Sequence, residues 1–204
     1  MKKQQLVKML NETELKILYA FFPEGTERTT KEIEDRSSYS HERAYSTLKI
    51  LEKKGILLKK KVGKALVYSI KKFDDSVYLA FTYYSLNKKN TFAKKYSSAW
   101  KAIDEFINKT KLEMVILFGS YSKGEVKERS DVDVLCINGN SEAEKIALSL
   151  RHKYNLKIAP VIVDKEDFRN IKSENPELWE ELIKFGIILK GQELFYDLVY
   201  RWDK

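Results

Sequence analysis

Two aspartates, Asp131 and Asp133, are the side chains in this sequence that are best suited to chemistry. Asp131 directly precedes the apolar run VDVLCI, and Asp133 is the second residue of that run. Residues i and i+2 of a β-strand point to the same side, so both carboxylates share one face. Burial of unpaired carboxylates is costly, and a hard divalent cation such as Mg²⁺ or Mn²⁺ removes that cost by binding both. Turn formation explains Asp131 but leaves Asp133 inside the strand. The pair therefore predicts a metal site.

The stretch before these aspartates has a specific spacing. Ten residues separate Ser120 from Asp131, which gives Gly-Ser-x10-Asp-x-Asp between two apolar runs. In this pattern, and in the interior order FGS-Tyr-x-basic-Gly-Glu, the sequence resembles the nucleotidyltransferase superfamily of DNA polymerase beta, and most closely its small prokaryotic members. The resemblance covers about residues 112–195, including PELWEELIKFGIILKG.

The resemblance implies nucleotide-binding roles for Gly119, Ser120 and Lys123. Gly119 lets backbone N–H groups approach a triphosphate, and Ser120 adds a hydroxyl donor at the start of a short helix. Lys123 offers a point charge to a phosphate oxygen. Asp131 and Asp133 are then the catalytic, metal-binding pair. The implied reaction transfers a nucleoside monophosphate from an NTP, with ATP expected, to a hydroxyl and releases pyrophosphate.

One part of the family pattern is missing from this sequence. Active relatives normally carry a third carboxylate on the following strand, where it helps to bind metal and to activate the attacking hydroxyl. Here that strand, 156–163, contains no acid and places Val161 or Ala159 at the position, while Pro160 indicates an edge or bulged strand. General-base assistance is worth about 10²–10⁴ in rate. The sequence therefore predicts nucleotide binding and leaves catalysis open.

The elements around this site alternate between strands and helices, which indicates an α/β (α+β) domain at 111–204 with a mixed sheet and flanking helices. Strands are predicted at 113–118, 131–137, 156–163 and 186–190, and helices at 141–154, 176–185 and 193–202. Residues 73–110 look helical and form either a connector or a dimerisation region.

The first third of the chain carries the whole positive surplus. Residues 1–72 contain 17 Lys and Arg against 9 Asp and Glu, a surplus of 8, whereas 73–204 contain 21 of each. Three helical stripes and a hairpin at 56–70 resemble a winged helix-turn-helix domain, with SHERAYSTLKILEKKGILLKKKVGKALVYSI as the specific match. The resemblance and the charge imply double-stranded DNA as the partner of residues 1–72. A winged helix used only for protein contacts is the alternative.

The same resemblance implies which residues would meet DNA, because the third helix enters the major groove and the wing contacts phosphates. The polar face of that helix presents Ser40, His41, Arg43, Ser46 and Lys49. The wing supplies Lys59, Lys60, Lys61 and Lys64.

The composition limits the class of protein. With 43% hydrophobic and 33% charged residues, the chain is globular rather than disordered. No segment approaches the ~20 apolar residues of a membrane span, so no membrane partner is expected. The single cysteine, Cys136, is typical of a reducing cytoplasm. A homodimer is expected by analogy with winged-helix regulators.

Two interpretations of the whole chain stay open. In the first, a metal-dependent nucleotidyltransferase is tethered to DNA or regulates its own transcription, in the manner of an antitoxin, with a protein as a conceivable acceptor. In the second, the chain is a non-enzymatic transcriptional regulator whose degenerate nucleotidyltransferase domain senses a nucleotide or mediates dimerisation. Nucleotidylation of a small molecule of the aminoglycoside type uses the same motif but leaves the DNA-binding module unexplained.

Overall fold

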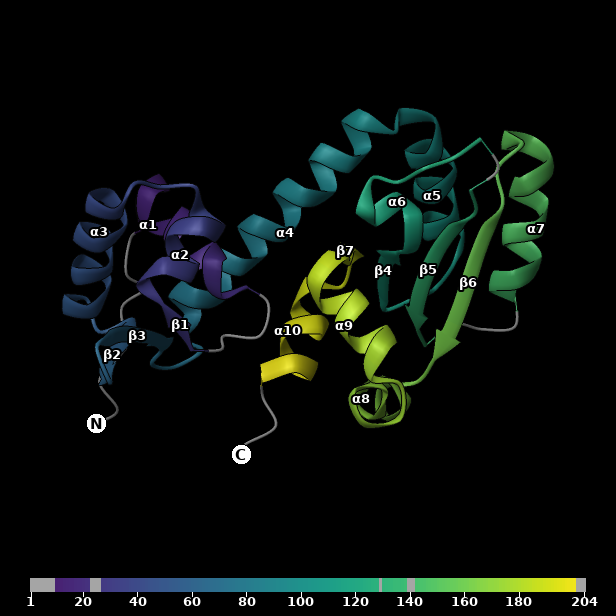
Figure 1. The fold of residues 1–204 in the computed structure, drawn as a ribbon. Coiled ribbons are helices and arrows are strands. Elements are labelled where there is room, and N and C mark those ends of the chain that lie inside the picture. Colours follow the sequence, from purple (N-terminus) through teal and green to yellow (C-terminus); the bar gives the residue numbers. More distant parts are fainter. Residues whose placement is uncertain (1–9, 23–26, 129, 139–141, 201–204) are drawn as a thin grey trace. The chain divides into compact units, whose positions relative to one another are not determined.

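The computed structural model describes residues 10–22, 27–128, 130–138 and 142–200 (Figure 1). It divides into two compact units, Met1–Tyr84 and Ser85–Lys204, and the division falls inside the long helix α4, Asp75–Lys95. The predicted mixed α/β class is confirmed. The predicted limits of 1–72, 73–110 and 111–204 stay a prediction.

From Glu12 to Ile70, the described residues of the first unit form three α-helices followed by an antiparallel hairpin, in the predicted order. Its elements are α1 (Glu12–Leu18), η1 (Tyr19–Phe21), β1 (Arg28–Thr29), α2 (Thr30–Ser37), α3 (His41–Lys53), β2 (Leu57–Val62) and β3 (Ala65–Ile70). The short strand β1 pairs with β3, which gives the strand order β1-β3-β2. Capping boxes at Asn11 and Thr29 begin α1 and α2, and the Ser40 side chain caps α3.

The second unit is built on a four-stranded mixed sheet. Its strands are β4 (Met114–Phe118), β5 (Val132–Ile137), β6 (Ile158–Val163) and β7 (Ile187–Lys190), in the order β6-β5-β4-β7. β5 and β6 are parallel, whereas β4 is antiparallel to both β5 and β7. All four predicted strands are present, and β6 is an edge strand, as Pro160 indicated.

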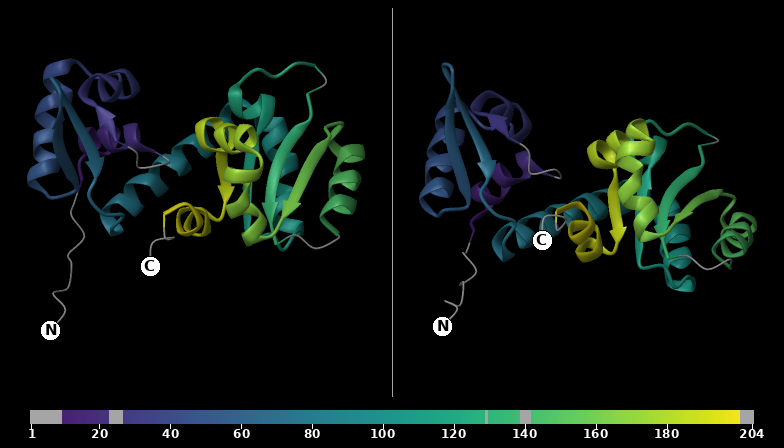
Figure 2. Two further views of the ribbon diagram at one scale, coloured as in Figure 1. Left: turned by 60° about the horizontal axis from the view of Figure 1, so that its bottom comes forward. Right: turned by 90° about the horizontal axis from the view of Figure 1, so that it is seen from below.

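Helices cover both faces of this sheet (Figure 2). One face packs against α5 (Ser97–Lys109) and α7 (Glu142–Tyr154), where Phe106 and Leu150 join Val134 in the core. The other face carries α8 (Lys165–Glu174), α9 (Pro176–Phe185) and α10 (Gln192–Tyr200). The last two residues of the predicted closing helix and the first residue of the predicted helix at 141–154 lie outside the described residues.

The register of β4 and β5 decides which face carries the aspartates. Leu117 pairs with Val134, and both face the core under α5 and α7. Phe118 pairs with Asp133 one step along, so Asp133 lies on the opposite face. Within the described ranges, every helix is too short or too polar to cross a membrane.

Phe106 tests the packing of α5 against the sheet, because its side chain is fully buried. Phe106→Ala should lower the free energy of unfolding by about 3–5 kcal/mol in urea denaturation, since it removes apolar contacts and leaves a cavity. The control is Lys101→Ala, at an exposed position of the same helix, which should stay within about 0.5 kcal/mol of the unmodified protein. A loss below about 1 kcal/mol for Phe106→Ala would contradict this packing.

Candidate functional site

The turn after β4 places Gly119 directly against Asp133. Gly119 has φ +72°, and a Cβ at this position would lie 2.2 Å from Oδ2 of Asp133. Only glycine combines this backbone conformation with the absence of a side chain, so any substitution would displace the carboxylate. The short helix α6 (Gly119–Lys123) starts here and carries Ser120 and Lys123, so the predicted loop residues and Asp133 come together.

The negative charges of Asp131 and Asp133 repel each other at the start of β5. Burial raises the pKa of Asp133, and the charges of Asp131 and Glu181 raise it further, whereas Lys157 lowers it. Two carboxylates in this relation fit a hard divalent cation, because a metal replaces mutual repulsion by attraction. Within the residues that the structure describes, no group of three His, Cys, Asp or Glu side chains is arranged to hold a metal. Any ion here would therefore depend on this pair.

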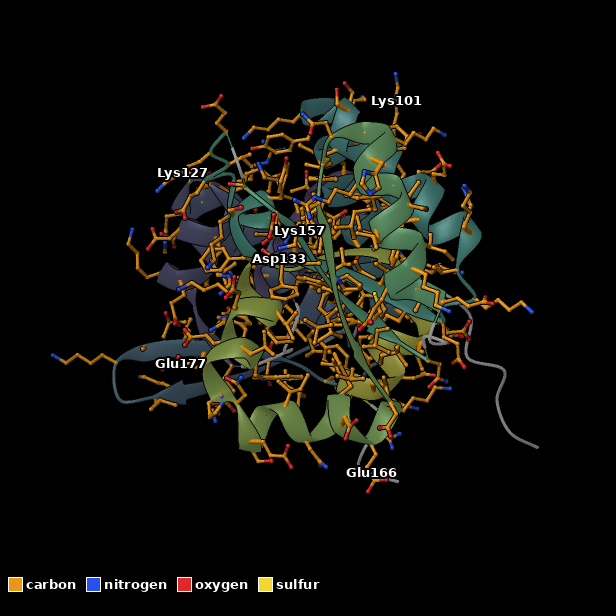
Figure 3. All side chains as sticks on the ribbon, turned by 90° about the vertical axis from the view of Figure 1, so that its right-hand side faces the viewer. Lys101, Lys127, Asp133, Lys157, Glu166 and Glu177 are labelled. Atoms are coloured by element: carbon orange, nitrogen blue, oxygen red, sulfur yellow. The ribbon has the colours of Figure 1, made fainter. Side chains whose placement is uncertain are left out.

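Lys157 neutralises Asp131. Its Nζ forms an ion pair with Oδ2 of Asp131, and both side chains are partly exposed. Figure 3 labels Lys157, which directly precedes β6, and Asp133, which lies in the neighbouring strand β5. In the parallel register of these strands Asp133 pairs with Ala159, so the position that faces Asp133 carries only a methyl group.

Glu181 of α9 binds the two groups that are predicted to bind phosphate, the Gly119 N–H and the Lys123 ammonium. Its Oε1 accepts a hydrogen bond from the Gly119 backbone N–H at 3.1 Å and lies 2.8 Å from Nζ of Lys123. The hydrogen bond to Glu181 raises the pKa of Lys123. One carboxylate oxygen thus binds both a backbone donor and a cation on α6, as a phosphate oxygen would.

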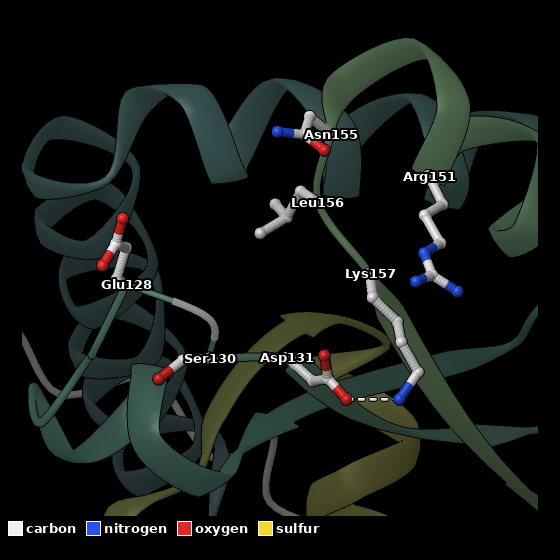
Figure 4. Close-up of a pocket in the computed structure, with 7 residues that line it drawn as sticks. All are labelled: Glu128, Ser130, Asp131, Arg151, Asn155, Leu156 and Lys157. Carbon is white, nitrogen blue, oxygen red and sulfur yellow. Dashed lines mark hydrogen bonds and ion pairs between the residues drawn. The ribbon is translucent and has the colours of Figure 1, made fainter.

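A cavity of about 490 Å³ opens beside Asp131 (Figure 4). Its charged lining residues are Glu128, Asp131, Arg151 and Lys157, and Ser130, Asn155 and Leu156 complete it. Arg151 and Lys157 come from the end of α7 and the segment that leads into β6, whereas Ser130 and Asp131 precede β5. The cavity reaches Asp131 from the side of the edge strand.

Two residues of this site, Lys157 and Glu181, were not identified from the sequence. Lys157 stands two positions before Ala159, so strand alternation could have placed it on the face of the aspartates. Glu181 is one of three glutamates in PELWEELIKF, and only the packing of α9 selects it.

The predicted DNA-contacting residues of α3 are exposed, but several already have partners in the first unit. Nδ1 of His41 lies 2.6 Å from Oε1 of Glu34. The Arg43 guanidinium donates to Thr13 Oγ1 and lies over the ring of Tyr39. Lys49 lies over Tyr45, Ser46 donates to the backbone carbonyl of Arg43, and Ser40 serves as the helix cap.

The lysines of the β2–β3 hairpin form two classes. Nζ of Lys59 lies 2.9 Å from Oε2 of Glu52, and Nζ of Lys60 lies 2.5 Å from Oε1 of Glu27. Lys61 and Lys64 are exposed and make no ion pair with any residue that the structure describes. The hairpin therefore offers two uncompensated positive charges near its turn.

The family model described as "Polymerase beta, Nucleotidyltransferase" matches residues 101–193. Three proteins of Methanocaldococcus jannaschii are similar to this chain, each with the name "Putative protein adenylyltransferase". MJ1305 is 33% identical over 115 residues, covering 49% of this chain and 73% of its own length. MJ0141 is 42% identical over 66 residues (29% and 67%), and MJ0604 is 34% identical over 98 residues (44% and 95%).

Two solved structures align weakly. "Crystal structure of the toxin-antitoxin with AMP-PNP" is 25% identical and covers 49% of this chain and 79% of its own, with a TM-score of 0.32. "Structure of TrmBL2, an archaeal chromatin protein, shows a novel mode of DNA binding" is 17% identical, covers 84% and 72%, and has a TM-score of 0.27. Both TM-scores are under 0.5, so neither structure bears on the fold or partners of this chain. The family model and the three relatives show that the chain belongs to the polymerase beta family of nucleotidyltransferases.

Proposed function

We propose that this chain is a metal-dependent nucleotidyltransferase that transfers AMP from ATP to a hydroxyl of a protein acceptor. The observation that carries the proposal is the contact of Gly119 with Asp133, which joins the Gly-Ser loop to the aspartate pair in a member of this family. The names of the three relatives support ATP as the donor and a protein as the acceptor.

In the proposed mechanism the loop binds the triphosphate. The Gly119 N–H and the Lys123 ammonium donate to phosphate oxygens once Glu181 releases them, and the Ser120 hydroxyl lies on the same helix. Asp131 and Asp133 supply carboxylate oxygens for Mg²⁺ or Mn²⁺. When bound, such a cation stabilises the charge that develops on the phosphoryl oxygens during in-line transfer.

The acceptor is proposed to enter through the cavity beside Asp131. Its wall carries two cationic side chains, Arg151 and Lys157, and two carboxylates, Glu128 and Asp131, so this mainly polar lining suits a polar segment next to the acceptor hydroxyl. Asp131 and Asp133 are proposed to take the hydroxyl proton, because they lie at the site of transfer and Ala159 on the neighbouring strand cannot accept one. The acceptor oxygen loses its proton to one of these carboxylates and bonds to the α-phosphorus, while the bond from the α-phosphorus to pyrophosphate breaks on the opposite side.

Asp131→Asn and Asp133→Asn test this proposal. Each should reduce transfer of labelled AMP to protein by at least about 100-fold, because each removes a charge that holds the cation and a candidate proton acceptor. Each should also abolish the thermal stabilisation that MgATP gives and EDTA reverses. Asp104→Asn, at an exposed position on α5, is the matched control and should behave like the unmodified protein.

The outcomes of that experiment separate the two interpretations of the chain. Transfer that depends on both aspartates supports the enzyme. Aspartate-dependent stabilisation by MgATP without transfer to any acceptor supports a nucleotide-sensing regulator instead. Transfer that survives both substitutions would refute the proposed site.

Glu181→Gln should tighten nucleotide binding by about two- to fivefold, because the loss of a partly exposed ion pair frees Lys123 and removes a repelling charge. Isothermal titration with a non-hydrolysable ATP analogue measures the change. Glu180→Gln, exposed on the same helix, keeps the contact and should bind like the unmodified protein. Weaker binding by Glu181→Gln alone would show that the glutamate supports the nucleotide rather than competing with it.

We further propose that the first unit is a winged helix-turn-helix that binds duplex DNA through α3 and the β2–β3 hairpin, with a homodimer as the bound form. The observation that favours this second function is the concentration of the surplus of eight positive charges in residues 1–72, together with the two uncompensated hairpin lysines. With this module the enzyme would act at, or regulate, its own promoter.

Lys61→Ala and Lys64→Ala test the DNA proposal in the full chain. Each should weaken duplex binding with little dependence on sequence and lower the slope of log K against log salt by about 1, since each removes a phosphate contact. Lys59→Ala and Lys60→Ala should have smaller effects, because these lysines are already paired. Lys101→Ala is the control, and salt-insensitive binding would contradict the proposal.

A further inference from the structure

We infer that the site holds one divalent cation rather than two, and that the Lys157 ammonium stands in place of the second cation. This inference rests on the proposed function and concerns how the same site is charged. It follows from the carboxylates that are present, the position of Lys157 and the resulting charge.

The neighbouring strand offers no oxygen ligand to the face of the aspartates. Paired residues of parallel β5 and β6 lie on the same side of the sheet, and Asp133 pairs with Ala159. Val161 lies two residues further along that face and is also apolar. Among the described residues of these two strands, a second ion beside Asp133 would therefore find side-chain ligands only in the aspartates that the first ion already uses.

Glu181 does not supply the missing carboxylate. Its Oε1 is bound by the Gly119 N–H and the Lys123 ammonium, and its charge is balanced there. The part of the chain that the structure describes contains no set of three ligating side chains arranged around a metal. Glu181 belongs to the phosphate-binding side of the site.

Lys157 lies on the face where the additional cation would be needed. Its backbone carbonyl accepts a hydrogen bond from the Val132 N–H, which continues the ladder of β5 and β6 by one residue. Lys157 therefore projects to the same side as Ala159, and its Nζ pairs with Oδ2 of Asp131 beside the cavity (Figure 4).

The charge of the site is consistent with one ion. Asp131, Asp133 and Lys157 sum to −1, so one divalent cation gives +1 and two would give +3. A site with three carboxylates and no lysine reaches the same +1 with two ions. Because paired metal ions lie about 3.5–4 Å apart, each uncompensated charge adds strong repulsion. Replacing one carboxylate by a methyl group and adding one ammonium together raise the charge of the site by two. This increase equals the charge of the one divalent cation that is lost.

The test counts Mn²⁺ bound to the full chain. Mn²⁺ is titrated into an equimolar complex of the chain with a non-hydrolysable ATP analogue, and free Mn²⁺ is followed by its electron paramagnetic resonance signal. The unmodified chain should take up one equivalent. Uptake of a second equivalent with comparable affinity would overturn the inference and leave the proposed function standing.

A double variant tests the roles of the two positions. Lys157→Ala combined with Ala159→Asp restores three carboxylates without the ammonium, and this variant should take up two equivalents. Lys145→Ala, an exposed control on α7, should take up one. A folded double variant that takes up only one equivalent would overturn the assignment to Lys157 and Ala159. If the unmodified chain binds no nucleotide at all, the proposed function fails and the inference fails with it.

Discussion

The repulsion between Asp131 and Asp133 is the constraint on which the site depends. Oδ2 of Asp133 fills the space that a Cβ at position 119 would occupy, so the carboxylate lies directly against the loop. The Lys157 ammonium offsets part of this repulsion by pairing with Asp131, whereas the Glu181 carboxylate adds to the negative charge around Asp133 and is itself paired with Lys123. A phosphate group would therefore replace Glu181 as the partner of Lys123 rather than fill a vacant, unbalanced pocket. Binding then exchanges one ion pair for another, so the net free energy of binding is smaller than the free energy of the newly formed contacts alone.

The topology of the second unit makes this arrangement possible. Antiparallel β4 and β5 bring Phe118, and hence Gly119, beside Asp133, although fourteen positions separate the two residues of the contact. Parallel β5 and β6, joined through α7, place the segment around Lys157 next to Asp131. Each contact of the site thus follows from the direction of a neighbouring strand.

Sequence reasoning reached those parts of the site that depend on local pattern. The spacing from Ser120 to Asp131 and the alternation at Asp133 are properties of single segments, so they could be read directly. Alternation along the strand indicates the face of Lys157, but its pairing with Asp131 depends on the register of β5 and β6. The position of Glu181 depends on the rotation of α9, which no local pattern contains. The hairpin shows the same limit, since four lysines look equivalent in sequence until Glu27 and Glu52 neutralise two of them.

Helix α4 contributes buried side chains to both units. Its first half packs Phe81 against Phe22 and Tyr84 against Tyr19, and its second half contributes Phe92 to the core under the mixed sheet. Further along the same helix, Ser85 bonds to Tyr196, and Lys88 donates to the backbone carbonyl of Gly186. A chain break or insertion in this helix would therefore displace core side chains of a unit, whereas a change in a flexible linker would leave both cores intact. The two units thus share one helix. Neither unit could be fused to a different domain without its own part of that helix.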